Sequence, residues 1–118
     1  MQYLMLIYDE EKAWDNFSEQ YQGEVLDKYH QLGEYLQGEG ILLGGERLQP
    51  TDTATSVRVR NGETLISDGP FAETKEQLGG FYMVECRDLD HANEVAAKIP
   101  SAEFGTIEVR PIWLMQDM

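Results

Sequence analysis

The hydrophobic pattern of the chain changes its period several times, and each change predicts a separate element. Tyr3–Tyr8 is a continuous apolar run closed by charged residues, which is typical of a buried central strand. Residues 9–17 are predicted to be a polar connection, with Trp14 and Phe17 as its apolar exceptions. Such aromatic side chains either pack on the core, which is their commoner role, or line a cleft.

A long amphipathic helix is predicted next. Ser18 suits the N-cap position, and Glu19 favours the first turn. Apolar residues then recur every three or four positions, which places them on one face of the helix. This stripe, which we expect to face the core, comprises Tyr21, Val25, Leu26, Tyr29, Leu32 and Leu36. Gly38 and Gly40 end the helix.

A second strand and a β-hairpin are predicted after the helix. Ile41–Leu43 opens the strand, Gly44-Gly45 indicates a bulge or a close backbone approach, and the strand is expected to reach Pro50. Thr55–Arg60 alternates with a period of two. Asn61-Gly62 is the favoured sequence for a type I′ turn, so the chain should double back there.

The two-residue turn fixes the register of this hairpin. The returning strand, residues 63–67, then carries Glu63 opposite Arg60 and Leu65 opposite Arg58. The first of these pairs is a favourable cross-strand contact between opposite charges.

The last third of the chain predicts a strand, a helix and a strand. Phe81–Arg87 is the first strand, and Asp88 or Asp90 can cap the helix that follows. Pro100 lies just beyond the end of this helix. Its buried stripe is predicted to be Leu89, Ala92, Val95, Ala96 and Ile99. Thr106–Trp113 forms the closing strand, with Ile107, Val109 and Trp113 on one face.

This order of elements predicts an α+β fold. Without the hairpin it is βαββαβ, the split βαβ arrangement, and the hairpin is an insertion. An antiparallel sheet with two helices on one face leaves its other face uncovered. The sheet of a second copy is the simplest cover, so the architecture predicts a homodimer.

The segment between the hairpin and the next strand is the one that periodicity does not fully explain. Asp68 can start an Asx-type turn, and Pro70 ends the preceding strand because it donates no backbone hydrogen bond. The spacing of Phe71, Lys75 and Leu78 predicts a short helical turn, which the next two glycines stop. Long connections of this kind are often functional; the alternative is a structural Ω-like loop whose charges are solvated.

The same segment carries a resemblance to a known family. Residues 68–82, DGPFAETKEQLGGFY, which we call the DGPF segment, resemble the signature of the DGPF-domain branch of the YCII-related family. The resemblance extends to residues 3–8, 44–50 and 108–113, and so covers nearly the whole chain. We therefore expect residues 1–118 to form a single domain of this kind.

The resemblance implies a ferredoxin-like α+β fold that pairs into a dimeric α+β barrel. Most members of the family lack an established activity. The broader superfamily includes small-molecule isomerases, a dehydrochlorinase-type enzyme, and monooxygenases that work without metal or flavin. The resemblance therefore defines the fold more closely than it defines the function.

Charge and composition exclude several classes of partner. The chain has 22 acidic and 9 basic residues, a net charge of −13, which opposes binding to nucleic acids and to anionic membranes. No basic leader precedes the first strand, and no apolar run approaches about 20 residues, so we expect a cytoplasmic protein. Cys86 is the single cysteine, and its position in a strand indicates a buried structural thiol.

The sequence predicts neither a metal site nor a cofactor site. His30 and His91 lie on different predicted helices, and no cysteine or histidine pair has the spacing of a zinc site. The glycine pairs lack the context of a phosphate-binding loop. His30 is either a residue at the boundary of the core or an acid–base group, and the first role is commoner.

Candidate chemistry gathers in and near the DGPF segment. Asp68, Glu73 and Glu46 are candidate proton acceptors, and Lys75 is a candidate for holding an anionic oxygen. Arg58 either binds a carboxylate or phenolate or simply pairs with Glu46. Candidate ligand contacts are Arg58, Pro70, Phe71 and Glu76. The alternatives are turn formation for Asp68 and exposed ion pairs for the other charges.

Three hypotheses of function follow. In the leading one the protein is a cofactor-independent homodimer that binds a small organic molecule beside the DGPF segment. If it is an enzyme, proton transfer on a cyclic or aromatic substrate fits best, as isomerisation or elimination. The second is a non-catalytic regulatory or accessory module that binds a protein, and the third gives the segment a purely structural role.

Overall fold

The structure, a computed structural model, describes residues 1–117. The helices and strands follow one another as β1 (Gln2–Asp9), α1 (Glu11–Asn16), α2 (Glu19–Gly38), β2 (Leu42–Arg47), β3 (Thr55–Arg60), β4 (Glu63–Asp68), β5 (Gln77–Glu85), α3 (Leu89–Ala96) and β6 (Thr106–Pro111). Short 3-10 helices occur at Thr51–Thr53, Pro100–Glu103 and Met115–Asp117. No helix within this part of the chain is both long enough and apolar enough to cross a membrane.

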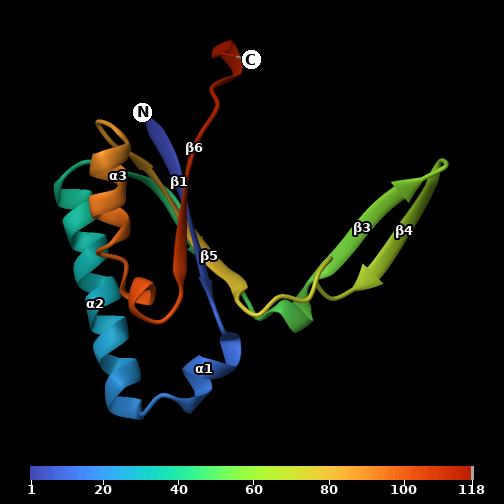
Figure 1. Cartoon of the computed structure of the whole chain (residues 1–118), viewed down its shortest axis with the longest axis horizontal. Helices are drawn as coiled ribbons and strands as arrows, with labels where there is room; N and C mark the ends of the chain where they lie inside the picture. The colour runs from blue at the N-terminus through green and yellow to red at the C-terminus, as the bar shows by residue number, and fades with distance from the viewer. Residues whose placement is uncertain (118) are drawn as a thin grey trace.

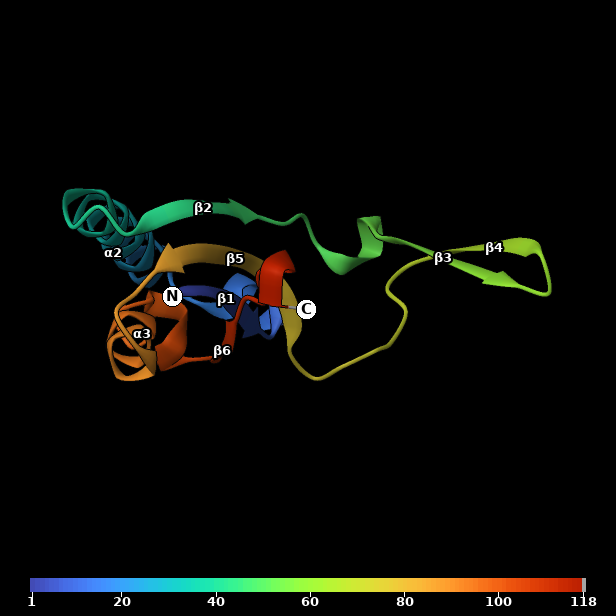
Figure 2. The ribbon, with the colours of Figure 1, turned by 90° about the horizontal axis from the view of Figure 1, so that it is seen from above.

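Four strands form one antiparallel sheet in the order β2-β5-β1-β6. Helices α2 and α3 lie on one side of this sheet, and the β3–β4 hairpin projects away from them (Figures 1 and 2). This arrangement confirms the predicted α+β fold with an antiparallel sheet, helices and an inserted hairpin. The single chain does not close into a barrel.

The core lies between the helices and one face of the sheet. Tyr3, Met5 and Ile7 of β1 point into it, as the period of two requires. The buried apolar residues are Tyr3, Met5, Ile7, Val25, Leu32, Leu36, Val84, Cys86, Ala92, Val95, Ala96 and Ile99. Burial raises the pKa of the Cys86 thiol, which favours its protonated form and agrees with the structural role predicted for it.

The opposite face of the sheet is open in the single chain. Strand pairing places Leu4 beside Met83 and Leu6 beside Phe81, and all four side chains are partly exposed. Tyr3–Tyr8 is therefore central, as predicted, but buries its side chains on one face only. We call these four residues the open sheet face.

Local signals identified the caps and the hairpin correctly. The Ser18 hydroxyl accepts a hydrogen bond from the Tyr21 N–H at 3.1 Å, and the Asp88 carboxylate accepts one from the His91 N–H at 2.8 Å. Asn61 and Gly62 have φ of 52° and 79°, as a type I′ turn requires. The predicted cross-strand pairs of the hairpin are all present.

The polar connection predicted over residues 9–17 is wrong, because Glu11–Asn16 forms helix α1. Its N-terminus has no side-chain cap of its own. Instead the Gln77 amide oxygen accepts a hydrogen bond from the Glu11 N–H at 3.0 Å. Trp14 and Phe17 then pack edge to face at 6.0 Å between ring centres, so aromatic packing also holds this region.

The helical turn predicted after Pro70 is also wrong. Residues 69–76 form no helix, and Gly79 and Gly80 lie inside β5. A Cβ on Gly80 would lie 2.7 Å from the Glu46 carbonyl oxygen, so the glycine permits close approach of β2 and β5. The bulge predicted near Gly44-Gly45 is confirmed by the register shift between Leu42 and Gly44.

Three further expectations need correction. Strand β2 ends at Arg47 and β6 ends at Pro111, so Trp113 lies beyond the sheet and is exposed. Leu26 and Leu89, which we assigned to buried helix stripes, are about half exposed. Leu26 instead forms part of the wall of a cleft.

Candidate functional site

Two adjoining hollows lie where β1 and β2 end. One, of about 490 Å³, is lined by residues of β1, α1 and the segment after β2. The other, of about 350 Å³, lies between α2 and the strands β2 and β5. Both are lined by Ile7, Arg47 and Gly79, so we treat them as one feature and call it the inner cleft.

Asp9 is the last residue of β1 and lines the inner cleft. Burial raises the pKa of its carboxyl group, and the nearby charges of Glu76 and Glu11 raise it further. The Arg47 guanidinium and the Ser101 hydroxyl act in the opposite direction. A carboxyl group whose pKa is raised toward neutral pH is suited to proton transfer.

Arg47 supplies positive charge to the same cleft. It ends β2, where it pairs with Gly80, and its side chain is exposed. Among the side chains that the structure describes, it forms no ion pair. Its guanidinium group is therefore available to an anionic or strongly polar oxygen of a ligand.

Tyr29 and Tyr82 line the part of the inner cleft beside α2, and Tyr29 is joined to the buried Ser101, which lines neither hollow. The Tyr29 and Ser101 hydroxyl groups share a hydrogen bond of 2.5 Å, and Ser101 is only 3% exposed. Burial is the main cause that raises the pKa of both Tyr29 and Tyr82, so both phenols stay protonated at neutral pH. The Ser101 hydroxyl, which is hydrogen-bonded to Tyr29, thus also offsets part of the rise in the pKa of Asp9.

Removing the Ser101 hydroxyl should show how much its hydrogen bond with Tyr29 contributes to the stability of the protein. We expect Ser101→Ala to lower the free energy of unfolding by about 1–2 kcal/mol, because Tyr29 then lacks its partner in a partly buried place. Tyr29→Phe should have a similar effect, and the double variant should lose less than the two single losses together. Urea unfolding of the four proteins measures this coupling; strictly additive losses would contradict it.

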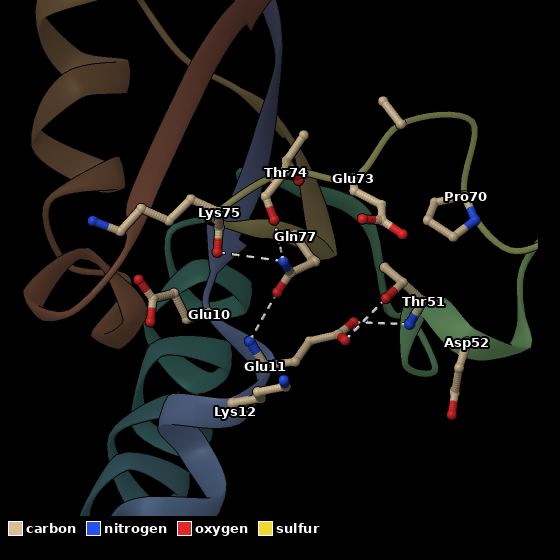
Figure 3. Close-up of a pocket in the computed structure, with 11 residues that line it drawn as sticks. Glu10, Glu11, Lys12, Thr51, Asp52, Pro70, Glu73, Thr74, Lys75 and Gln77 are labelled. Atoms are coloured by element: carbon tan, nitrogen blue, oxygen red, sulfur yellow. Dashed lines mark hydrogen bonds between the residues drawn. The ribbon is translucent and has the colours of Figure 1, made fainter.

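A third hollow adjoins the inner cleft along the DGPF segment. It has a volume of about 530 Å³, and Figure 3 shows the residues that line it. The Glu11 carboxylate accepts hydrogen bonds from the Thr51 N–H at 2.8 Å and the Thr51 hydroxyl at 3.0 Å. The Gln77 side chain donates to the Thr74 carbonyl at 2.6 Å and accepts from the Glu11 N–H. We call this hollow the loop pocket; its hydrogen bonds attach the DGPF segment to α1.

Three of the residues predicted from the sequence line the loop pocket. These are Pro70, Glu73 and Lys75. The Lys75 side chain points away from Pro70 and Glu73 in Figure 3, so the three do not converge on one point. A fourth predicted residue, Glu46, lines the part of the inner cleft that lies beside α2.

The remaining predicted residues lie elsewhere. Glu76 accepts a hydrogen bond from the Thr106 hydroxyl at 2.9 Å, and it lines a hollow on the β6 side of the sheet. Asp68 ends β4, Arg58 lies on β3, and Phe71 is 82% exposed. None of these last three lines the inner cleft or the loop pocket. Their predicted roles in binding or catalysis remain predictions.

Sequence reasoning missed the residues that do converge. Asp9 directly follows the apolar run Tyr3–Tyr8, which is a signal that could have identified it. Arg47 lies two residues after the predicted bulge, beside a glycine pair that needs close backbone approach. Tyr29 was assigned to the apolar stripe of the long helix, and no sequence pattern around Ser101 marks it as part of a site. In residues 1–117, no three or more His, Cys, Asp or Glu side chains group as a metal site would need.

The sequence matches the YCII-related domain family over residues 1–116, and the chain belongs to this family. It is 38% identical over 116 residues to an uncharacterized protein of Rhizobium meliloti (strain 1021), covering 97% of this chain and 94% of that protein.

A solved structure shares the fold. It is 5-chloro-2-hydroxyhydroquinone dehydrochlorinase from Burkholderia phenoliruptrix AC1100, in complex with 2,5-dihydroxybenzoquinone. The TM-score is 0.54 with 14% sequence identity, and the similarity covers 98% of this chain and 97% of that one.

Proposed function

We propose that this protein binds a small cyclic or aromatic molecule in the inner cleft and transfers a proton within it, without a cofactor. The observation that carries this proposal is Asp9, whose raised pKa occurs in a cleft that also presents Arg47, which forms no ion pair within residues 1–117. The candidate base is thus Asp9 in place of Asp68, Glu73 or Glu46, and the candidate cation is Arg47 in place of Lys75 or Arg58.

The chemistry follows from these two groups. The Asp9 carboxylate takes a proton from a carbon next to a carbonyl group, and the electron pair of that C–H bond moves onto the carbonyl oxygen. The Arg47 guanidinium stabilises the oxyanion that forms. Return of the proton to a different carbon gives an isomer, whereas departure of an anionic leaving group completes an elimination. The Tyr29 and Tyr82 hydroxyls are protonated donors for oxygens of the ring.

The comparisons support this class of reaction through the shared fold. The solved structure is named a dehydrochlorinase and holds a dihydroxybenzoquinone, a cyclic ligand with acidic oxygens. The sequence of residues 68–82 supports assignment to the DGPF branch of the family. The alternative is a regulatory or accessory role without catalysis. The thermal-shift screen described below distinguishes it from binding of a small molecule.

We further propose a homodimer that pairs through the open sheet face as a dimeric α+β barrel. Leu4, Leu6, Phe81 and Met83 form a row of apolar side chains that helices do not cover. Burying such a row contributes about 25 cal/mol for each Å² removed from water. The same face on a second copy is a self-complementary cover.

A thermal-shift screen against phenols, lactones, small acids and quinones tests the ligand site. A ligand present at 100 times its Kd should add about 2.7 kcal/mol to the free energy of unfolding. We expect Arg47→Gln to abolish the shift, whereas Lys28→Gln, which removes an exposed charge beside Glu103, should retain it. A shift that survives Arg47→Gln but disappears in Lys75→Ala would place the ligand in the loop pocket instead. A flat screen across all four classes would favour the accessory role.

A further inference from the structure

The β3–β4 hairpin, residues 55–68, stands apart from the rest of the protein, and we call it the arm. Its two strands pair only with each other within residues 1–117. Both views show it extending far from the helices and the main sheet (Figures 1 and 2). The radius of gyration is 16.5 Å, whereas a compact chain of this length should have about 13.5 Å. One chain alone therefore leaves the arm uncovered.

The arm has one apolar face and one polar face. Cross-strand pairing places Val57 beside Ile66, with Val59 on the same side, and these three side chains are 61%, 68% and 60% exposed. The opposite face carries Arg58, Arg60, Glu63 and Leu65 together with Ser56 and Ser67. Antiparallel ribbons with this alternation normally pack one face and expose the other. Val57, Val59 and Ile66 thus form an exposed apolar patch on a face that also carries Thr55, Thr64 and Asp68.

The stability of the arm leads to the same conclusion. A two-stranded hairpin by itself is at best marginally stable in water. At its base the Gly69 N–H donates to the Ala54 carbonyl at 2.7 Å and the Ser56 hydroxyl donates to the Gly69 carbonyl at 2.8 Å, and these bonds join the two legs of the hairpin to each other. An ordered arm with three exposed β-branched side chains therefore needs a second surface to hold it.

Charge favours another copy of this chain as the second surface. The whole protein carries −13, so two copies repel each other over most of their surface. The arm holds two arginines and two acidic residues, Glu63 and Asp68, and is neutral, so the rest of the chain carries the entire −13. Its outer part carries Arg58 and Arg60 against Glu63 alone, on the face opposite Val57 and Ile66, so these charges can flank an acidic surface that the apolar face contacts. An acidic protein of the same sequence supplies that surface, and two-fold symmetry makes the contact reciprocal.

We propose that the arm of each protomer docks through Val57, Val59 and Ile66 onto a second copy of the chain, so that two protomers clasp each other. A six-residue strand spans about 20 Å, which is long enough to reach well across a neighbouring protomer. This inference rests on the proposed homodimer but adds a contact separate from the open sheet face.

Two double variants test it, each changing one cross-strand pair of the same hairpin. Val57→Thr with Ile66→Thr makes the apolar face polar and keeps β-branched side chains in the strands. Ser56→Thr with Ser67→Thr changes the neighbouring pair on the opposite face, keeps both hydroxyl groups and both arginines, and is the matched control. Sedimentation equilibrium should show a dimer Kd raised at least 100-fold in the first variant and at most about threefold in the control.

The outcomes separate the arm from the dimer itself. A dimer Kd that the Val57/Ile66 variant leaves unchanged overturns the arm contact while the homodimer stands. A native protein that stays monomeric at all concentrations overturns both. A second measurement needs no destabilised variant. A photo-crosslinking amino acid replaces Ile66 in a mixture of isotopically heavy and light chains, and mass spectrometry detects crosslinks between the two kinds of chain. Heavy–light crosslinks support the docked arm, and their absence in a dimeric sample overturns it.

Discussion

Asp9→Asn is expected to lower turnover by roughly 10²–10⁴-fold, the usual contribution of a positioned acid–base group. Asparagine keeps the size and polarity of the side chain but cannot accept the proton. Ligand affinity should change far less, because Arg47 and the two tyrosines remain to hold the molecule. Turnover and ligand-induced stabilisation, measured on the best compound from the screen, together distinguish a lost base from a lost binding site.

The same substitution should increase stability at neutral pH. The pKa of Asp9 is raised from its ordinary value of 3.8, so the folded protein binds this proton more tightly than the unfolded chain does. Stability therefore falls as pH rises from about 3.8 through the raised value, and it stays lower above it. Asparagine has no such titration. The stability difference between Asp9→Asn and the native protein should thus be smallest in acid and grow as the pH approaches neutrality.

Asp27→Asn is the matched control, because it removes an exposed carboxylate from α2 that lines neither the inner cleft nor the loop pocket. Urea unfolding at several pH values, with turnover measured alongside, compares the two variants. The proposal fails if Asp9→Asn retains native turnover, or if it is less stable than the native protein at neutral pH.

This opposition between stability and activity originates mainly in the burial of Asp9, and the acidic composition of the chain strengthens it. Because carboxylates are abundant, the sequence pattern indicated Asp68, Glu73 and Glu46 and not Asp9. In the folded protein two other carboxylates, Glu76 and Glu11, lie close enough to Asp9 to raise its pKa after burial has done so. Glu11 is held in place by its hydrogen bonds to Thr51. Negative charge that contributes nothing to core packing thus tunes the candidate base.

Local sequence signals predicted the elements that depend on local interactions. The caps at Ser18 and Asp88 and the turn at Asn61-Gly62 use groups within a few residues of one another, so the pattern of residues was sufficient. Helix α1 was missed because its N-terminal hydrogen bond comes from Gln77, 66 residues away. The glycines of β5 were interpreted as the stop of a turn because their partner, the Glu46 carbonyl, lies on another strand.

The candidate site depends almost entirely on such distant contacts. Asp9, Arg47, Tyr29 and Ser101 come from four separate elements, and no two of them are near in sequence. The DGPF segment, by contrast, is a contiguous motif and was easy to recognise. The structure shows that its Gln77 joins the segment to α1 beside the inner cleft, which gives the motif a supporting contact with the site.

Gly105→Ala is expected to destabilise the protein by an amount at or above the upper end of the roughly 1–3 kcal/mol that overpacking produces. A Cβ at this position would overlap the Tyr8 carbonyl oxygen and lie 2.9 Å from the Asp9 Cβ. Both neighbours belong to the end of β1, where backbone pairing with β6 leaves little freedom to move. The added methyl group must therefore push β6 away or displace Asp9, so turnover should fall along with stability.

Gly33→Ala is the control for this prediction, because it makes the same chemical change inside α2. A Cβ there has no neighbour within 4 Å, and alanine favours a helix interior, so stability should rise by about 0.4–1 kcal/mol. Urea unfolding midpoints should move in opposite directions for the two variants, with native turnover retained in Gly33→Ala. A Gly105→Ala protein as stable and as active as the native one would show that β1 and β6 separate easily at this point. The position of Asp9 would then not depend on their close approach.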